Sequence, residues 1–334
     1  MFPLFFYYMS KRIIGLGNAL ADILTQIESD APLEKLGFGR GSMNLVGRDT
    51  HEHISELTAG MENKVISGGS AANTIRGLAR LGIPCSYIGK IGPDTVGDFM
   101  RNEMQALGVH PQLIETDTPT GRCMVLISPD GERTMATFLG AAVELAHHEI
   151  APEMLEGYDI LHIEGYLVQN HDLIREAVRK AKAAGLMISL DMASYNVVEE
   201  NHTFLTGLVR DYVDLLFANE DEARVFTGKE PEEAVREIAA MCEIAVVKTG
   251  PKGSLIAVAG EITPIEAIPA KVVDTTGAGD LYATGFLYGL SLGLPLHECG
   301  EIGSLVAAKA IETIGPTLTP AGLKEILAVL PTEK

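Results

Sequence analysis

The feature that most constrains the fold is the alternation of strand-like and helix-like segments along the chain. Short apolar runs such as "RIIGLG" (12–17) and "LMISLD" (186–191) alternate with segments whose apolar residues recur every three or four positions, such as "AANTIRGLARLG" (71–82). Several of these helical segments end in glycine just before the next strand-like run, which is typical of helix C-termini. The pattern predicts βαβ crossovers and therefore an α/β fold, with a mostly parallel central sheet and helices on both faces.

Two stretches interrupt this alternation. Residues 23–66 lack clean helical periodicity, and "GRCMVLISPDGERTMATFLG" (121–140) predicts a β-hairpin that turns at "SPDGE". We expect segments of about 23–66 and 118–140 to form a small β lid. Ligands of open α/β sheets bind at the carboxyl ends of the strands, so a lid there would enclose a substrate. Its exposed edge could pair with a second copy of the chain, giving a homodimer, or remain free.

Composition limits the partners. The chain has 334 residues, 46% of them apolar, and no linker that would separate two domains, so we expect one domain over residues 11–330. Residues 1–10 are expected to form an N-terminal extension, disordered or weakly ordered, with Met9 as an alternative start. A formal net charge of −19 argues against nucleic acid and against anionic membranes. Four scattered cysteines without CxxC spacing fit a reducing, cytoplasmic setting, and a small-molecule partner is favoured.

The segment "VVDTTGAGDLYATGFLYGL" (272–290) predicts a strand, a glycine-containing loop and then a helix. We expect "KVVD" (271–274) to be the strand. Gly277 and Gly279 would let the backbone approach a ligand, and the N–H groups of the first helical turn would attract an anion. Asp280, at this helix end, is either a helix cap or a base that takes a proton from a hydroxyl. No GxxxxGK[ST] sequence exists, and Leu20 breaks a dinucleotide-type glycine fingerprint, which disfavours a nicotinamide dehydrogenase.

The segment "DTTGAGDLYATGF" (274–286) resembles the C-terminal signature of the ribokinase/PfkB carbohydrate kinase family. The likeness extends along nearly the whole chain, through "IIGLGNALADIL", "SGGSAANTIRGLARLG", "FANEDEA", "VVKTGPKGS" and "AAKAIETIGP". It implies a ribokinase-like fold. It also implies that Asp280 is the catalytic base and that Gly277, Ala278 and Gly279 form the anion hole.

The same resemblance implies an acceptor site. It assigns substrate binding to Asn18, Asp22, Gly68, Gly69 and Asn73. From the residues alone, Asn18 could be a turn residue and Asp22 an exposed loop acid. Ser70 stands where many ribose kinases have lysine, which puts ribose itself in doubt.

ATP and Mg²⁺ are the cofactors that the resemblance implies, and K⁺ is a further one. The ATP site would include Asn219, Glu222, Lys248, Thr249, Gly250 and Gly253. Glu222 would hold Mg²⁺ through water, although an Asn followed by acids is also a helix N-terminus. A monovalent cation would be bound by Asp274 and Thr276, with carbonyls near Ala310, Thr313 and Gly315 and the hydroxyl of Thr319.

The motif set "GNALAD", "SGGSAANT", "DGERTMATFLGAAVEL" and "EGY" resembles the adenosine-kinase-like branch of this family. The expected activity is therefore ATP-dependent phosphorylation of a primary hydroxyl of a nucleoside, with adenosine favoured. We expect Met43, Leu126 and Phe138 of the lid to pack against the base, while Arg122 and Arg133 either approach phosphate or decorate a β edge. The alternatives are a fructose- or ribose-type sugar kinase and a non-catalytic ligand-sensing homologue.

Overall fold

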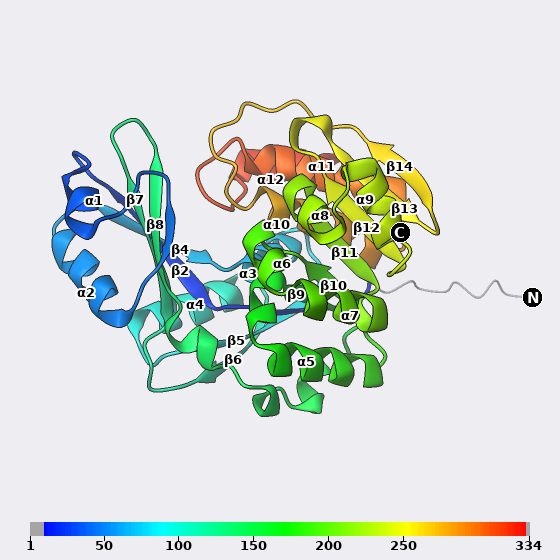
Figure 1. The fold of residues 1–334 in the computed structure, drawn as a ribbon, viewed down its shortest axis with the longest axis horizontal. Helices are drawn as coiled ribbons and strands as arrows, with labels where there is room; N and C mark the ends of the chain where they lie inside the picture. The colour runs from blue at the N-terminus through cyan, green and yellow to red at the C-terminus, as the bar shows by residue number, and fades with distance from the viewer. Residues whose placement is uncertain (1–9, 332–334) are drawn as a thin grey trace, which may run out of the picture.

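A computed structural model of the chain describes residues 10–331. The extension expected over residues 1–10 lies, apart from Ser10, outside the described residues. The described chain contains a nine-stranded main sheet and a five-stranded lid sheet that projects from it (Figure 1).

The main sheet is parallel except at one edge. In spatial order its strands are β14 (Glu261–Ile265), β13 (Ser254–Val258), β12 (Ile244–Lys248), β11 (Leu215–Asn219), β10 (Met187–Asp191), β9 (Ile160–Glu164), β1 (Ile13–Leu16), β5 (Cys85–Ile91) and β6 (His110–Glu115). All pairings from β6 to β12 are parallel, whereas β13 and β14 are added antiparallel as a hairpin. The predicted α/β class with a mostly parallel sheet is confirmed.

Helices cover both faces of this sheet. One face carries α5 (His171–Ala183), α6 (Tyr195–Glu200), α7 (His202–Tyr212), α8 (Glu220–Thr227) and α9 (Pro231–Ile238). The other carries α3 (Ser70–Arg80), α4 (Thr95–Ala106), α10 (Ala278–Ser291), α11 (Leu296–Ala310) and α12 (Pro320–Val329). Short 3₁₀ segments are η1 (Gly140–Glu144), η2 (His147–Glu149), η3 (Pro152–Leu155), η4 (Gly165–Gln169) and η5 (Gly250–Lys252).

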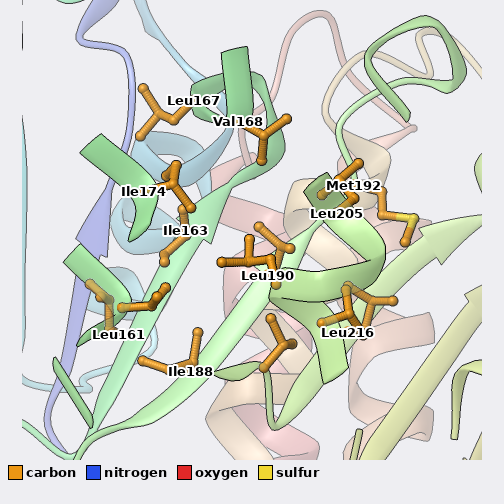
Figure 2. Close-up of a cluster of buried hydrophobic side chains, with 14 of the residues drawn as sticks. Leu161, Ile163, Leu167, Val168, Ile174, Ile188, Leu190, Met192, Leu205 and Leu216 are labelled. Carbon is orange, nitrogen blue, oxygen red and sulfur yellow. The ribbon is translucent and has the colours of Figure 1, made fainter. Parts of the chain in front are cut away.

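Neighbouring strand residues enter opposite cores because side chains alternate along a strand. Leu161 and Ile163 of β9 pack with Leu190 of β10 beneath α5 and α7, as Figure 2 shows, while Ile160 joins the cluster on the opposite face. Burial on both faces explains why these strands are continuous apolar runs.

The lid sheet has the order β3 (Met43–Leu45), β8 (Arg133–Phe138), β7 (Gly121–Ile127), β2 (Leu20–Gln26) and β4 (Asn63–Gly68). The hairpin expected at 121–140 is present as antiparallel β7 and β8. The stretch 23–66, which lacks clean helical periodicity, also contains two short helices, α1 (Ala31–Leu36) and α2 (Arg48–Leu57), which cover the outer lid face. Only Leu33 is buried in α1, and only His51 and Ile54 in α2, so neither has an apolar stripe long enough to show periodicity.

The strand expected at 271–274 is also absent. Val272 and Val273 are exposed by 61% and 52%. The N–H groups of Val273 and Asp274 both donate to the Ile311 carbonyl at the end of α11, at 2.8 and 3.2 Å. Because the sheet already ends at β14, these β-branched residues have no strand to pair with, and they form part of a loop that leads into α10.

Within the part of the chain that the structure describes, none of the helices has the length and apolar character needed to cross a membrane.

Candidate active site

Polar side chains gather at the carboxyl ends of the parallel strands. Asn18 follows β1, and four more residues close the next strands of the sheet: Glu164 on β9, Asp191 on β10, Asn219 on β11 and Lys248 on β12. All five line a cavity of about 1330 Å³ that extends from this edge to the inner face of the lid. This is where α/β sheets bind ligands.

Glu164 and Asp191 were not predicted as site residues. Each is an acid that ends a buried strand, in "ILHIE" (160–164) and "MISLD" (187–191). The sequence therefore does contain a signal for these two site residues, because each is an ionisable residue that ends an otherwise apolar strand.

Asp280 lies where the N-termini of α3 and α10 meet. Its carboxylate accepts hydrogen bonds from Ser70 Oγ at 2.7 Å and from Asn73 Nδ2 at 2.9 Å. Thr74 Oγ1 donates to the backbone carbonyl of Asp280 at 3.1 Å, which fixes the two helices against each other. The predicted base and the predicted substrate residue Asn73 are therefore joined directly.

A buried arginine orients Asn73. Arg76 Nη1 donates to Asn73 Oδ1 at 3.0 Å and to the Ser67 carbonyl at 2.8 Å. Because the amide oxygen is occupied by Arg76, the amide NH₂ of Asn73 faces Asp280. This arrangement directs a donor at the carboxylate whether or not a ligand is bound.

The surroundings of Asp280 suit a base that works near neutral pH. Burial raises the pKa of Asp280 to about 7, and the negative charge of Asp191 acts in the same direction. The hydrogen bonds from Asn73 and Ser70 and the positive charge of Lys248 oppose the rise in pKa. A carboxylate with a pKa near the working pH accepts a proton effectively and still exists in its charged form.

The start of α10 forms a cradle for an anion. Gly277 precedes the helix with φ +70°, and a side chain there would clash with Pro316. Among the described residues no side chain caps this helix end, so its N–H groups and the positive end of the helix dipole face the cavity. A Cβ on Gly279 would lie 3.0 Å from Lys248 Nζ, which brings an ammonium group to the same place.

Lys248 belongs to a buried charge cluster. Its Nζ lies 2.8 Å from Asp191 Oδ2, and the two side chains are 15% and 8% exposed. Glu222 is 2% exposed, and burial together with the nearby charge of Asp191 raises the pKa of Glu222 to about 7. Glu222 also forms a reciprocal cap with Asn219, accepting from its N–H and from Nδ2 at 2.7 Å each. The helix-terminus interpretation of this pair is therefore correct, and both residues still line the cavity.

The acceptor end of the cavity lies under the lid. Asp22 is on lid strand β2 rather than in a loop, and burial raises its pKa to about 6 against the opposing charges of Arg76 and Arg133. Gly68 lies beside it, where a Cβ would come within 2.6 Å of Asp22 Oδ1. A Cβ on Gly69, which has φ +89°, would clash with the backbone oxygen of Asn18.

Glu164 supports this end from beneath. It accepts from Asn18 Nδ2 at 2.6 Å and from the Ala71 N–H at 3.2 Å. Burial raises the pKa of Glu164 to about 7, although these hydrogen bonds oppose the rise. The side chain of Asn18 is thereby fixed at the start of the lid.

Two of the residues predicted to bind ATP take part in a turn. Gly250 lines the cavity, whereas Thr249 and Gly253 are not among its described lining residues. The Thr249 N–H donates to the Gly253 carbonyl at 2.8 Å. Gly253 has φ +97°, and a side chain there would clash with the Ile265 carbonyl. The turn between β12 and β13 therefore accounts for the glycine at position 253.

The lid presents a largely apolar face to the cavity. Met43, Leu45 and Met135 line it, and Met43 and Leu45 are 58% and 66% exposed. The expectation for Leu126 and Phe138 is wrong. Leu126 is fully buried in the outer cluster beneath α1 and α2, and the Phe138 ring lies 5.3 Å from His51 of α2. Residues of one strand alternate between faces, so Met135 and Phe138 lie on opposite faces of β8.

The residues expected to bind a monovalent cation lie in the loop before α10. Asp274 Oδ2 lies 2.6 Å from Arg133 Nη1 of the lid, and Thr276 Oγ1 donates to Asp274 Oδ1 at 2.8 Å. The Gly315 N–H donates to Asp274, and the Gly315 carbonyl accepts from the Thr317 N–H at 2.8 Å. The Thr319 hydroxyl accepts from the Gly322 N–H as the cap of α12. A positively charged side chain therefore contacts Asp274 and Thr276, the two residues whose side chains were expected to bind the cation.

Among the described residues, no group of three or more His, Cys, Asp or Glu side chains could hold a metal ion by itself. A divalent ion at this site would need further oxygen ligands from a substrate or from water.

Comparison with known proteins agrees with this fold. The family model for pfkB family carbohydrate kinase matches residues 39–321. A structure of adenosine kinase from Sinorhizobium meliloti is 35% identical, covers 95% of this chain and 98% of its own, and superposes with a TM-score of 0.83. A probable sugar kinase from Rhizobium etli CFN 42 is 34% identical with the same coverage and a TM-score of 0.85.

More distant relatives match over a similar length. The adenosine kinase of Saccharomyces cerevisiae is 27% identical over 92% of this chain and 97% of its own length. The family model covers well over half of the chain, and the similarity extends from the lid to the α10 signature. The chain therefore belongs to the pfkB family of carbohydrate kinases and is a kinase of that family.

Proposed function

We propose that the protein transfers the γ-phosphoryl group of ATP to a primary hydroxyl of adenosine. The observation that carries this proposal is the position of Asp280, whose carboxylate lies at the uncapped N-terminus of α10, next to the Lys248 ammonium and facing the cavity under the lid. One point of the molecule thus combines a proton acceptor, anion-binding amides and a positive charge.

The proposed reaction uses these groups together. Asp280 takes the proton of the acceptor hydroxyl as its oxygen attacks the γ-phosphorus, and the bond from that phosphorus to the β–γ bridging oxygen breaks, releasing ADP. The amides of Gly277 and Gly279 hold the negative charge of the transferring group. The Ala278 N–H, which the resemblance also assigned to the anion hole, donates to the Thr275 carbonyl at 3.1 Å. Lys248 lies within reach of the same oxygens.

Mg²⁺ fits the donor set that the cluster provides. The charges of the Asp191, Glu222 and Asp280 carboxylates all act on Lys248, and burial together with the charge of Asp191 raises the pKa of Glu222. Mg²⁺ would be held by Glu222 through water together with the phosphates, where it would neutralise charge on the triphosphate.

Adenosine is favoured over a bare sugar by the size and lining of the cavity. Asn18 and Asp22 can accept hydrogen bonds from or donate them to the ribose hydroxyls, while Met43, Leu45 and Met135 offer apolar surface to a purine. Sugar phosphates are disfavoured because Arg122 and Arg133, the two arginines of the lid hairpin, are paired with Asp94 and Asp274. The adenosine kinase of Sinorhizobium meliloti supports the same choice by similarity.

An acceptor panel tests the proposal. Adenosine, ribose, fructose and fructose 6-phosphate are compared by kcat/KM at saturating ATP and Mg²⁺, with ADP release as the readout. We expect adenosine to lead by about 100-fold, which corresponds to about 2.8 kcal/mol of additional binding in the transition state. If fructose or ribose gave the highest kcat/KM, the protein would be a sugar kinase and not an adenosine kinase. No turnover with any acceptor would indicate a non-catalytic ligand-sensing protein.

A further inference from the structure

Arg133 reaches from the lid to the loop that precedes the anion hole. It opens β8 next to the hairpin turn, where it pairs with Ile127 of β7. Its Nη1 lies 2.6 Å from Asp274 Oδ2 and 3.2 Å from Thr276 Oγ1. The side chains of Arg133 and Asp274 are 19% and 7% exposed, so the contact is largely shielded from solvent.

Asp274 has no acceptor position left for a cation. Oδ1 accepts from the N–H of Thr276 at 3.0 Å and from its hydroxyl at 2.8 Å, while Oδ2 accepts from the Gly315 N–H and from Arg133 at 2.6 Å each. A carboxylate offers about four lone-pair sites, and four donors use them. A metal cation requires oxygen lone pairs, but the groups that face Asp274 here are N–H and O–H donors. The implied K⁺ site therefore does not fit these residues.

The contact bears directly on the anion hole. The carbonyl of Thr275, which lies between Asp274 and Thr276, accepts from the Ala278 N–H at 3.1 Å. Gly277 follows in the left-handed conformation and starts α10. Asp274 and Thr276 thus fix the turn that presents residues 277–279, and Arg133 supplies the positive charge that neutralises Asp274.

We propose that Arg133 is a positioning residue that takes the place of a monovalent cation, so that closure of the lid, and not K⁺, orders the anion-hole loop. This inference rests on the proposed kinase function. Its consequence is a coupling between the two ends of the site. The lid that covers the acceptor also completes the phosphoryl-binding turn, and an open lid leaves Asp274 without its counter-charge.

A second lid arginine provides a matched control. Arg122 Nη2 lies 2.8 Å from Asp94 Oδ2, with side-chain exposures of 23% and 22%. Asp94 caps α4 and also accepts from the Thr120 N–H, so this pair ties the base of the lid to the main sheet without involving the α10 loop. Arg122→Gln therefore removes a comparable ion pair and leaves Asp274 intact.

The test measures turnover and loop order in three salts. Wild type, Arg133→Gln, Arg133→Lys and Arg122→Gln are assayed in potassium, sodium and tetramethylammonium chloride at equal ionic strength, with the best acceptor of the panel. We expect wild type and Arg122→Gln to vary less than twofold among the salts. Arg133→Gln should lose at least tenfold in kcat in tetramethylammonium and recover part of it in potassium, and Arg133→Lys should retain most of the wild-type rate.

Amide hydrogen exchange of residues 271–281 gives a readout that is independent of activity. We expect faster exchange in Arg133→Gln than in wild type or Arg122→Gln. Three results would overturn the inference. They are equal amide exchange rates in Arg133→Gln and wild type, a severalfold activation of wild type by potassium, and a turnover of Arg133→Gln that responds to potassium no more than that of wild type. If no acceptor is phosphorylated, the proposed function fails, while the exchange measurement still decides the role of Arg133.

Discussion

Lys248 and Asp191 form a buried ion pair, with Nζ 2.8 Å from Oδ2, directly beside the first turn of α10. Neighbouring carboxylates and the ion pair raise the pKa of Lys248 although its burial opposes this, so the side chain stays charged. The pair holds a positive charge beside the proposed anion hole and shields this charge from bulk solvent. The family signature has no P-loop lysine, and in the proposed mechanism Lys248, at the end of β12, supplies a comparable charge.

Replacing Lys248 tests whether this charge acts on the transferring group. We expect Lys248→Met to lower kcat by roughly 10²–10³-fold, the usual loss when one group that stabilises developing charge is removed. Lys252→Met is the control, because Lys252 lies in the turn that follows β12 and its side chain is 80% exposed. Steady-state kinetics with varied ATP would separate kcat from the KM for ATP. Unchanged kcat in Lys248→Met would limit this residue to a structural role.

Asp22 should act on the acceptor and not on ATP. We expect Asp22→Ala to raise the KM for the acceptor by about 10- to 100-fold or to abolish turnover, because a hydrogen bond to a charged group contributes about 1.5–3 kcal/mol. Calorimetry should still detect ATP binding. Asp130→Ala removes an exposed lid carboxylate paired with Arg40 and should change neither constant. If Asp22→Ala lost ATP binding and still bound the acceptor, Asp22 would belong to the ATP end of the site and not to the acceptor end.

The raised pKa of Asp280 also affects stability. Between its ordinary value of 3.8 and about 7, the folded protein holds a proton that the unfolded chain has released. The contribution of this group to the free energy of unfolding therefore falls as pH rises through that window. We expect Asp280→Asn to be more stable than wild type at pH 8, by roughly 1–3 kcal/mol, since one pKa unit corresponds to about 1.4 kcal/mol.

Urea unfolding of both proteins at several pH values between 5 and 8.5 measures this difference. The advantage of Asp280→Asn should shrink toward pH 5, where the wild-type carboxyl group is protonated and resembles the amide. Asp130→Asn serves as the control, because Asp130 lies on the surface and its hydrogen bond with Arg40 lowers its pKa. A stability difference that does not change with pH would contradict the raised pKa of Asp280.

The main sheet was predictable because its strands are buried on both faces and leave unmistakable apolar runs, as in Ile160–Glu164. The helices α1 and α2 were not, since each buries only one or two side chains. Val272 and Val273 favour a strand locally, but no partner strand lies next to them. The local preference of these residues for a strand therefore gave a wrong prediction, because a strand also needs a partner strand to pair with.

The family resemblance predicted residues from separate motifs that line one cavity, among them Asn18, Lys248 and Asp280, but it did not predict most of the contacts between them. Gly277, Gly279 and Asp280 belong to one motif, and the structure brings Asp280 together with Asn73. The pairs Lys248–Asp191 and Arg133–Asp274 join residues 57 and 141 positions apart, so no local pattern reports them.

The most direct test of the account is the turnover of Asp280→Asn with adenosine. The amide keeps the size of the side chain and can still bond with Ser70 and Asn73, but it does not accept a proton. We predict that kcat falls by roughly 10²-fold or more while the dissociation constant for ATP changes only severalfold, because the base acts on the acceptor hydroxyl in the transition state. Turnover close to that of the wild type would contradict the assignment of Asp280 as the base.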